Sequence, residues 1–310
     1  MILGASRLLL ALVLSTASSL AQDMPLMVVL GIGQDGGVPQ LGSEDHPAWD
    51  DPDLRQAATS LALVDPKSGQ RWLFEATPDI RQQMRLLHTI APAERSPGIA
   101  GIFLTHAHMG HYTGLLFLGH ESLGAQSVPV FTMRRMATFL ASNGPWDQLV
   151  RYRNIQLRVM EAGTPIRLTE TLTVTPFLVP HRPEYSEVVG YRIAGPRHSV
   201  LFIPDIDSWE QWDRQGHRLE DELAQVDRAW LDGTFYADGE IPGRDMSTFP
   251  HPRISETMNR LADLPRSERG KLHFIHLNHT NPALRLDSKE AQTILESGFG
   301  LARTGDRFGL

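Results

Sequence analysis

Histidine or aspartate side chains stand at or just past the ends of five short apolar runs, and this pattern limits the fold more than any other feature of the 310-residue chain. Each run has the length and composition of a buried strand. A strand holds the following side chain rigidly at the sheet edge, where the next loop is exposed. We therefore expect a strand-rich α/β fold that gathers chemistry at the strand ends, with a hairpin of strands over 60–65 and 71–75 and a helix over 111–119. The pairs are 101–105 with His106, 172–179 with His181, 199–203 with Asp205, 226–231 with Asp232, and 272–275 with His276.

The segment 106–111 carries three imidazoles in six residues, at His106, His108 and His111. A tight turn can aim several imidazoles at one point, and neutral imidazole is a common ligand for zinc, iron or manganese. The chain contains no cysteine, so a bound metal must use His, Asp, Glu or backbone oxygen. We predict a metal site here rather than a chance run of exposed histidines.

The composition favours a small-molecule substrate over nucleic acid. The chain has 29 Lys and Arg residues against 36 Asp and Glu residues, which gives a formal net charge of −7. Phosphate backbones are bound by clusters of Lys and Arg, which a mildly acidic protein does not favour. The sequence leaves the oligomeric state open, a dimer included.

The first 21 residues resemble an export signal. Arg7 precedes the apolar run 8–14, and a small-x-Ala sequence ends at Ala21. We predict cleavage after Ala21, a mature single domain over residues 22–310, and a periplasmic or secreted location. An uncleaved anchor or a buried first helix is the alternative. No other run is long and apolar enough to span a membrane, so we expect no membrane span after processing.

The segment 106–111 resembles the His-x-His-x-Asp-His signature of the metallo-β-lactamase fold. The resemblance implies a four-layer αββα sandwich, in which loops at the ends of two packed β-sheets supply the metal ligands. It also implies further ligands at His181, Asp205 and His276, with Asp205 bridging two metals. Glu75 stands where the family has a structural acid that orients ligand histidines.

A narrower resemblance is to the branch of coenzyme PQQ synthesis protein B. It is carried by the stretches 36–40, 77–83, 111–116 and 275–282, which match in order. Proteins of that branch carry metal-binding cysteines after the Pro-Gln pair, whereas residues 41–53 contain none. They also have a degraded histidine motif, whereas this chain keeps most of it.

Gly110 stands where the family motif has the aspartate that binds the second metal, and glycine offers no ligand atom. We therefore expect the tighter site at His106, His108 and His181, three nitrogen ligands with an open position, as in catalytic zinc sites. Occupancy should then be nearer one metal than two. On the same hypothesis, Gly110→Asp should raise the affinity for the second ion.

A second ion would be held more weakly by His111, Asp205 and His276. His279 lies three residues past His276. It is a candidate for the missing ligand, and a hydrogen-bonding role around the site is the equal alternative.

The resemblance implies a metal-dependent hydrolase, in which a metal-bound hydroxide attacks an ester, phosphodiester, lactone or amide. His111 and Asp205 are the catalytic candidates, with Asp205 orienting the water. The expected cofactor is one or two zinc ions, with iron or manganese as alternatives. Two other classes stay open: an iron-dependent oxidoreductase or oxygenase in cofactor biosynthesis, and a non-catalytic carrier of a metal or ligand.

The glycines Gly31, Gly33 and Gly36 match a dinucleotide-binding fingerprint, G-x-G-x-x-G, after a strand. A dinucleotide site of this type requires a helix to begin directly after the glycines, because the helix N-terminus binds the pyrophosphate. The residues that follow, 37–42, make a poor helix start. We predict a glycine-rich turn on the rim of the site.

Overall fold

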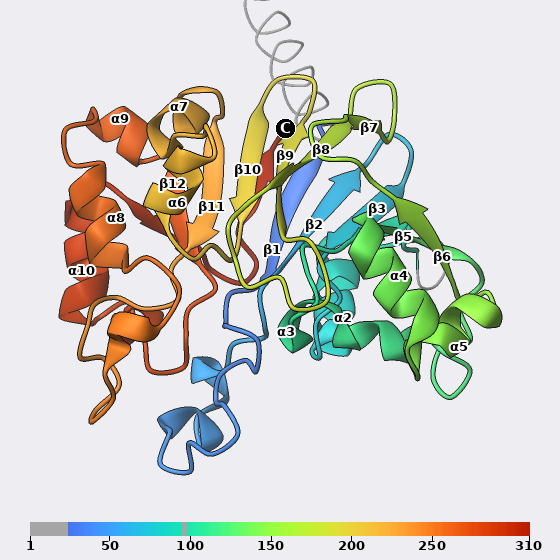
Figure 1. Ribbon diagram of the computed structural model, residues 1–310, viewed down its shortest axis with the longest axis horizontal. Helices are drawn as coiled ribbons and strands as arrows, with labels where there is room; N and C mark the ends of the chain where they lie inside the picture. Colours follow the sequence, from blue (N-terminus) through green and yellow to red (C-terminus); the bar gives the residue numbers. More distant parts are fainter. Residues whose placement is uncertain (1–23, 95–97) are drawn as a thin grey trace, which may run out of the picture.

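The structure is a computed structural model that describes residues 24–94 and 98–310, so the predicted signal peptide lies outside the described residues. Two seven-stranded mixed sheets pack face to face, with helices on their outer sides (Figure 1). This arrangement confirms the predicted αββα sandwich. Within the described ranges, no helix is long and apolar enough to cross a membrane.

The first sheet has the strand order β14-β1-β2-β3-β4-β5-β6. Its β14, β1, β2 and β3 pair antiparallel, which includes the predicted hairpin of β2 and β3, and β3 to β6 pair parallel. The strands are β1 (Leu26–Gly31), β2 (Ser60–Asp65), β3 (Gln70–Phe74), β4 (Gly101–Phe103), β5 (Val128–Thr132), β6 (Ile155–Val159) and β14 (Arg307–Gly309).

The second sheet has the order β13-β12-β11-β10-β9-β8-β7. Its β7 to β10 pair antiparallel and β10 to β13 pair parallel, so the carboxyl ends of β10, β11 and β12 meet at one edge. The strands are β7 (Ile166–Arg167), β8 (Thr173–Leu178), β9 (Val189–Ala194), β10 (Ser199–Ile203), β11 (Arg228–Asp232), β12 (Leu272–Ile275) and β13 (Gly300–Leu301).

Helices α2 to α5 cover the outer side of the first sheet, and α6 to α10 cover the second (Figure 1). The α-helices are α2 (Ile80–Ile90), α3 (Met109–Tyr112), α4 (Arg134–Ser142), α5 (Trp146–Arg151), α6 (Trp209–Arg214), α7 (Leu219–Ala224), α8 (Ile254–Arg260), α9 (Arg266–Arg269) and α10 (Lys289–Glu296). The 3₁₀ helices are η1 (Pro47–Trp49), η2 (Pro52–Leu54), η3 (Thr113–Leu118), η4 (Met246–Thr248) and η5 (Pro282–Leu284).

The segment 111–119 is not the regular helix that its sequence suggests. The one-turn helix α3 passes directly into η3. Gly114 packs against the backbone of residues 76–77, where its N–H donates to the carbonyl of Ala76 at 2.8 Å. A Cβ at Gly114 would overlap the carbonyl oxygen of Thr77. This close approach to the chain after β3 takes precedence over helical propensity.

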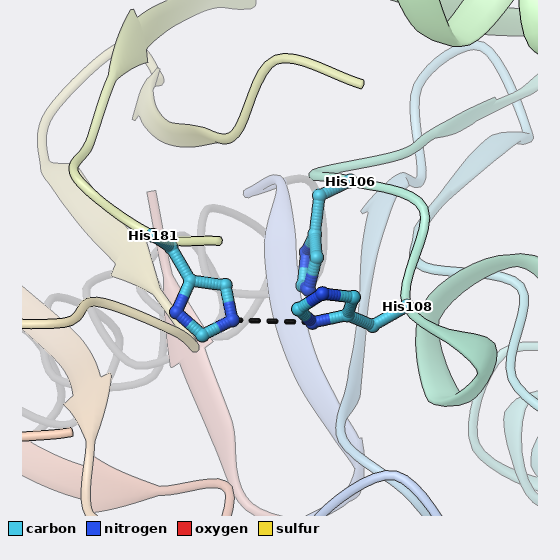
Figure 2. A group of neighbouring side chains, drawn as sticks. All are labelled: His106, His108 and His181. Carbon is cyan, nitrogen blue, oxygen red and sulfur yellow. Dashed lines mark hydrogen bonds between the residues drawn. The ribbon is translucent and has the colours of Figure 1, made fainter. Parts of the chain in front are cut away.

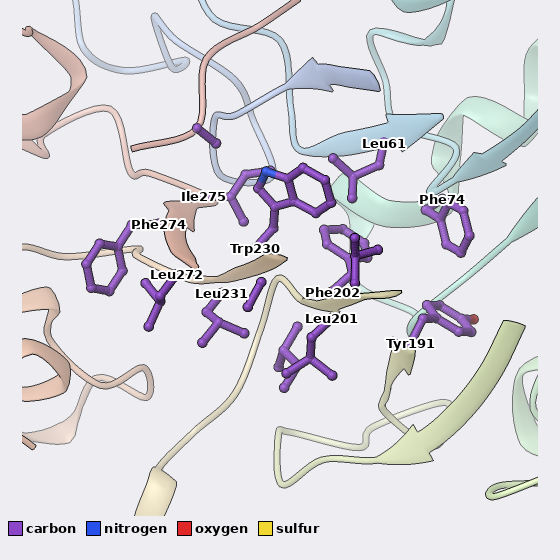
Figure 3. Packing of buried hydrophobic residues seen from close by; sticks show 14 of the residues in the cluster. Leu61, Phe74, Tyr191, Leu201, Phe202, Trp230, Leu231, Leu272, Phe274 and Ile275 are labelled. Carbon is purple, nitrogen blue, oxygen red and sulfur yellow. The ribbon is translucent and has the colours of Figure 1, made fainter. Parts of the chain in front are cut away.

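An aromatic cluster joins the two sheets (Figure 3). The ring of Phe74 from β3 lies 5.2 Å from that of Phe103, and 5.5 Å and 6.3 Å from those of Tyr191 and Phe202 in the second sheet. All four side chains are fully buried. The sheets are therefore held rigidly against each other, which brings the loops at their ends together at one edge.

Candidate metal centre

The turn with the histidine motif follows β4 and is tied to the second sheet. The N–H of Val189, at the start of β9, donates to the carbonyl of Thr105 at 3.2 Å. The N–H of Ala107 donates to the hydroxyl of Ser186 at 2.9 Å. A loop from one sheet is thus anchored on the other, and its imidazoles face loops of the second sheet.

Three of the predicted ligands, His106, His108 and His181, form what we call the first triad (Figure 2). Nε2 of His181 lies 3.1 Å from Nδ1 of His108. The ring centroid of His106 lies 4.4 Å from that of His108 and 5.2 Å from that of His181. One nitrogen from each ring can therefore reach a common centre.

The outward nitrogen of each imidazole in the first triad has its own partner. Nδ1 of His106 lies 2.8 Å from the hydroxyl of Thr105, and Nδ1 of His181 lies 2.7 Å from a carboxylate oxygen of Asp207. Nε2 of His108 lies 3.0 Å from the carboxylate of Glu184. Partners of this kind orient ligand rings and leave the other nitrogen facing the metal position.

A second group lies beside the first, and we call Asp35, His111 and His276 the second triad. Oδ1 of Asp35 lies 3.0 Å from Nε2 of His111 and 3.9 Å from Nε2 of His276. Asp35 was not predicted as a ligand from the sequence. The indication that the sequence offers is the position of this acid within the glycine-rich turn predicted at the rim of the site.

Asp205 lies between the two triads. Its Oδ2 lies 3.0 Å from Nε2 of His111 and 3.3 Å from Nε2 of His276, while its Oδ1 lies 3.8 Å from Nε2 of His181. The two oxygens of one carboxylate therefore face different triads. This is the geometry that a bridging ligand requires.

The histidines of the two triads have different proton affinities. Burial lowers the pKa of His106 and of His108, so that both imidazoles are neutral at neutral pH and free to bind a cation. Burial opposes protonation of His111 as well, but the carboxylates of Asp205 and Glu75 raise its pKa well above the usual value. The carboxylates around His111 therefore favour positive charge in the second triad.

Glu75 lies behind the second triad in the closed core. Its Oε1 lies 3.4 Å from Nδ1 of His111, and its Oε2 accepts a hydrogen bond from the N–H of Thr105 at 3.3 Å. Burial raises the pKa of Glu75. Its φ of +79° is rare for a residue with a side chain. This placement is the one that the resemblance implied for an acid that orients a ligand histidine.

His279 does not join the metal centre. Among the described residues it belongs to none of the groups whose ligand atoms converge. Its ring lies 6.0 Å from that of His46, whose Nε2 contacts the carbonyl of His279 at 3.1 Å. The chain turns at His276, whose φ is +65°. His279 is therefore not placed to supply the lost ligand, and among the described residues the carboxylate of Asp35 converges with His111 and His276.

His251, which lies in the loop before α8, was also not predicted from the sequence. Its Nδ1 lies 2.7 Å from Oδ2 of Asp232, the strand-end acid of β11, and 3.7 Å from Oδ1 of Asp205. Burial opposes protonation of His251, but Asp232 raises its pKa. His251 and Asp207 also line a cavity of about 520 Å³ beside the first triad. No local pattern marks His251 in the sequence.

Inward atoms of both triads pass a direct test for metal ligation. All those of the second triad, with His106 Nε2 of the first and Asp205 Oδ2 between them, are buried without a hydrogen-bond partner of acceptable geometry, a condition that is costly unless a cation satisfies it. Nitrogen and carboxylate donors without thiolate suit zinc, iron or manganese. These unpartnered atoms are His106 Nε2, His111 Nε2, His276 Nε2, Asp35 Oδ1 and Asp205 Oδ2.

The glycine-rich turn is not followed by a helix. Gly33 forms isolated bridges to Ala58 and to Leu277, and the chain continues as turns until η1. The segment therefore links the two sheets beside the triads. The structure excludes the helix N-terminus that a pyrophosphate site of the fingerprint type requires.

Known proteins are similar to this chain in sequence and in fold. Coenzyme PQQ synthesis protein B of Xanthomonas oryzae pv. oryzae (strain MAFF 311018) is 27% identical over 304 residues, covering 90% of this chain and 98% of that protein. The protein of the same name from Methylorubrum extorquens (strain PA1) is 28% identical over 308 residues, with the same coverage.

Solved structures agree with these matches. The crystal structure of Zn(2+)-bound PqqB from Methylobacterium extorquens superposes with a TM-score of 0.75 at 23% identity, covering 92% of this chain and all of that one. A diphosphatase from the PhnP family superposes with a TM-score of 0.65 at 21% identity, covering 92% and 97%. Residues 70–277 match the Beta-lactamase superfamily domain. This match covers more than half of the chain, which therefore belongs to the beta-lactamase superfamily, with PqqB proteins among its relatives.

Proposed function

We propose that this protein is a zinc-dependent hydrolase that acts on a small molecule. The observation that carries the proposal is the carboxylate of Asp205, which faces the unpartnered Nε2 of His111 in the second triad and the inward Nε2 of His181 in the first. A divalent cation bound by such ligands lowers the pKa of a coordinated water to near 7 and so supplies a hydroxide nucleophile at neutral pH. No serine or cysteine nucleophile is needed.

The protein's own residues divide the remaining work. An oxygen of Asp205 is placed to accept a hydrogen bond from the attacking water and orient it. His111 is enclosed by Glu75 on one side and by Asp35 and Asp205 on the other, so it binds rather than transfers protons. His251 is the candidate proton donor to the leaving group, because Asp232 favours its protonated form and it lines the adjacent cavity.

The cavity beside the first triad favours an uncharged carbonyl substrate, meaning an ester, lactone or amide, over a phosphodiester. Its lining includes four acids and two arginines. Both guanidinium groups are engaged by carboxylates: Arg253 contacts Asp238 at 2.8 Å, and Arg260 contacts Glu220 at 2.9 Å. A lining with more acids than arginines repels an anionic substrate. The four acids are Asp207, Glu210, Asp238 and Glu256.

The test is a metal analysis joined to a hydrolysis panel. Purified protein is stripped with a chelator, reloaded with zinc, manganese or ferrous iron, and assayed on 4-nitrophenyl acetate, a γ-lactone and bis(4-nitrophenyl) phosphate. We expect zinc to restore carbonyl hydrolysis. His108→Ala should abolish it, while His120→Ala, a change at an exposed histidine, should not.

Two results would count against this function. A fully zinc-loaded protein that hydrolyses none of the three bonds would contradict it. Oxygen consumption that depends on iron, without hydrolysis, would instead support the oxidoreductase alternative.

We also propose that the chain is exported and that residues 1–21 are removed, on the basis of the sequence pattern at Arg7 and Ala21. Mass determination of the N-terminus of protein recovered from cell fractions tests both points. A mature N-terminus at Gln22 in the periplasm or medium is expected, and retention of Met1 on a cytoplasmic protein would refute the proposal.

A further inference from the structure

The backbone of Gly110 leaves no room for a side chain. A Cβ built on Gly110 would overlap the Cα and Oδ1 atoms of Asp35 and come within 2.8 Å of its Cβ. Real Cβ atoms do not approach other atoms so closely, and one of the obstacles is backbone. A side chain at position 110 and the observed position of Asp35 therefore exclude each other.

The atom that fills this space is itself a potential ligand. Oδ1 of Asp35 is buried, has no hydrogen-bond partner and lies 3.0 Å from Nε2 of His111. With Asp205, the second triad then offers two imidazole nitrogens and two carboxylates, and the two anionic charges match those of a divalent cation. Gly110 therefore does not leave this site short of a ligand.

The turn that carries Asp35 is held independently of the triad. The N–H of Gly37 donates to the carbonyl of Gln34 at 2.7 Å, which closes a four-residue turn around Asp35. The N–H of Gln34 donates to the carbonyl of Leu277 at 2.9 Å, next to His276. Gly37 has a φ of +72°, which glycine adopts without strain. The backbone thus presents the carboxylate to the triad before any cation binds.

We propose that Asp35 is the carboxylate ligand of the second metal ion, and that it replaces, from another part of the chain, the aspartate that the related motif carries at position 110. Gly110 is then required as glycine, because any side chain there displaces Asp35. This inference deepens the proposed function and rests on its metal centre. It reverses the expectation from sequence that Gly110→Asp strengthens the second site.

The experiment measures zinc stoichiometry and affinity on full-length mature protein, by calorimetry and by elemental analysis after desalting. The unmodified protein should bind two ions per chain. Asp35→Ala should bind one ion tightly, and its affinity for the second ion should fall by more than about 100-fold. Even the loss of a group that only orients a ligand lowers metal affinity by about 10- to 100-fold. Gly110→Ala should give the same loss although it removes no ligand atom.

The pair is also tested as a thermodynamic cycle. Because both changes remove the same ligand, the double variant Asp35→Ala/Gly110→Ala should be no weaker in zinc binding than either single variant. Additive losses would overturn the inference, as would a higher second-site affinity in Gly110→Asp.

Two matched controls separate ligand loss from damage to the fold. Gln34→Ala alters the same turn without touching a carboxylate, and Gly144→Ala adds a methyl whose nearest neighbour is 3.7 Å away. Both should keep two ions, and thermal unfolding in chelator should show that all variants fold. Two ions retained in Asp35→Ala would disprove the role of Asp35 and leave the hydrolase proposal standing. If the unmodified protein binds no zinc at all, the role of Asp35 and the hydrolase proposal are both disproved.

Discussion

Oε1 of Glu75 lies 3.4 Å from Nδ1 of His111, and both side chains are almost completely shielded from solvent. A buried acid beside a buried imidazole orients the ring and sets its charge, because the carboxylate favours the protonated nitrogen on its own side. The opposite nitrogen then faces Asp35 and Asp205. Glu75 is therefore a positioning residue for the second triad.

Glu75→Gln should lower the affinity for the second metal ion by about 10- to 100-fold and leave the affinity for the first unchanged. Loss of a group that hydrogen-bonds to a ligand histidine typically has an effect of this size. Zinc titration by calorimetry measures it. Asp65→Asn changes a buried acid in the same sheet, at the end of β2; it is the matched control and should keep both affinities. Equal weakening of both ions would show general damage instead.

His251→Asn should lower kcat by about 10²- to 10⁴-fold without changing metal content, because a proton donor assists the leaving group and does not hold the cation. Asparagine tolerates the positive φ of +93° at this position better than most residues. The effect should be largest for substrates with poor leaving groups and small for 4-nitrophenyl acetate. A loss of bound zinc along with activity would instead make His251 a ligand.

Glu240 should make folding less favourable as the pH rises. It is mostly buried, and burial raises its pKa to about 7. An unfolded chain ionises this acid near 4.5, whereas the folded chain keeps the proton until about pH 7, so stability falls between these values, by about 1–3 kcal/mol.

Glu240→Gln should remove that pH dependence, since the amide does not ionise: its oxygen can accept from the N–H of Tyr236 and its NH2 can donate to the hydroxyl of Thr280. Urea unfolding at pH 5 and pH 8 measures it in chelator. The variant should gain stability relative to the unmodified protein at pH 8 only. The same difference at both pH values would contradict the assignment.

Phe74→Ala should cost about 3–5 kcal/mol of unfolding free energy, because the ring packs against aromatic side chains of both sheets and leaves a cavity. Leu116→Ala, at a partly exposed position, is the comparison and should cost far less. Urea unfolding followed by fluorescence and by circular dichroism gives both values. A Phe74 variant as stable as the Leu116 variant would mean that the sheets do not depend on this contact.

Much of the framework could be predicted from local patterns. A short apolar run predicts a buried strand, and the sequence also shows which residue follows that run. The strand-end positions of His106, His181, Asp205 and His276 could therefore be predicted from the sequence alone. Their convergence follows from the family resemblance, which predicted the two packed sheets. The prediction failed over 111–119, because the close approach of Gly114 to the carbonyl of Thr77 is a contact with another segment.

Only the tertiary structure decided the second half of the metal centre. Asp35 follows β1 of the first sheet and His251 lies in a loop beside the second, and contacts between segments far apart in the sequence bring both to the histidines; Glu75, which the resemblance implied, follows β3. Glu75 and His251 also have positive φ values, which surrounding contacts impose against local preference. By itself the sequence determined that Gly110 lacks a ligand; the packing of residue 35 against residue 110 decided that a carboxylate is there nonetheless.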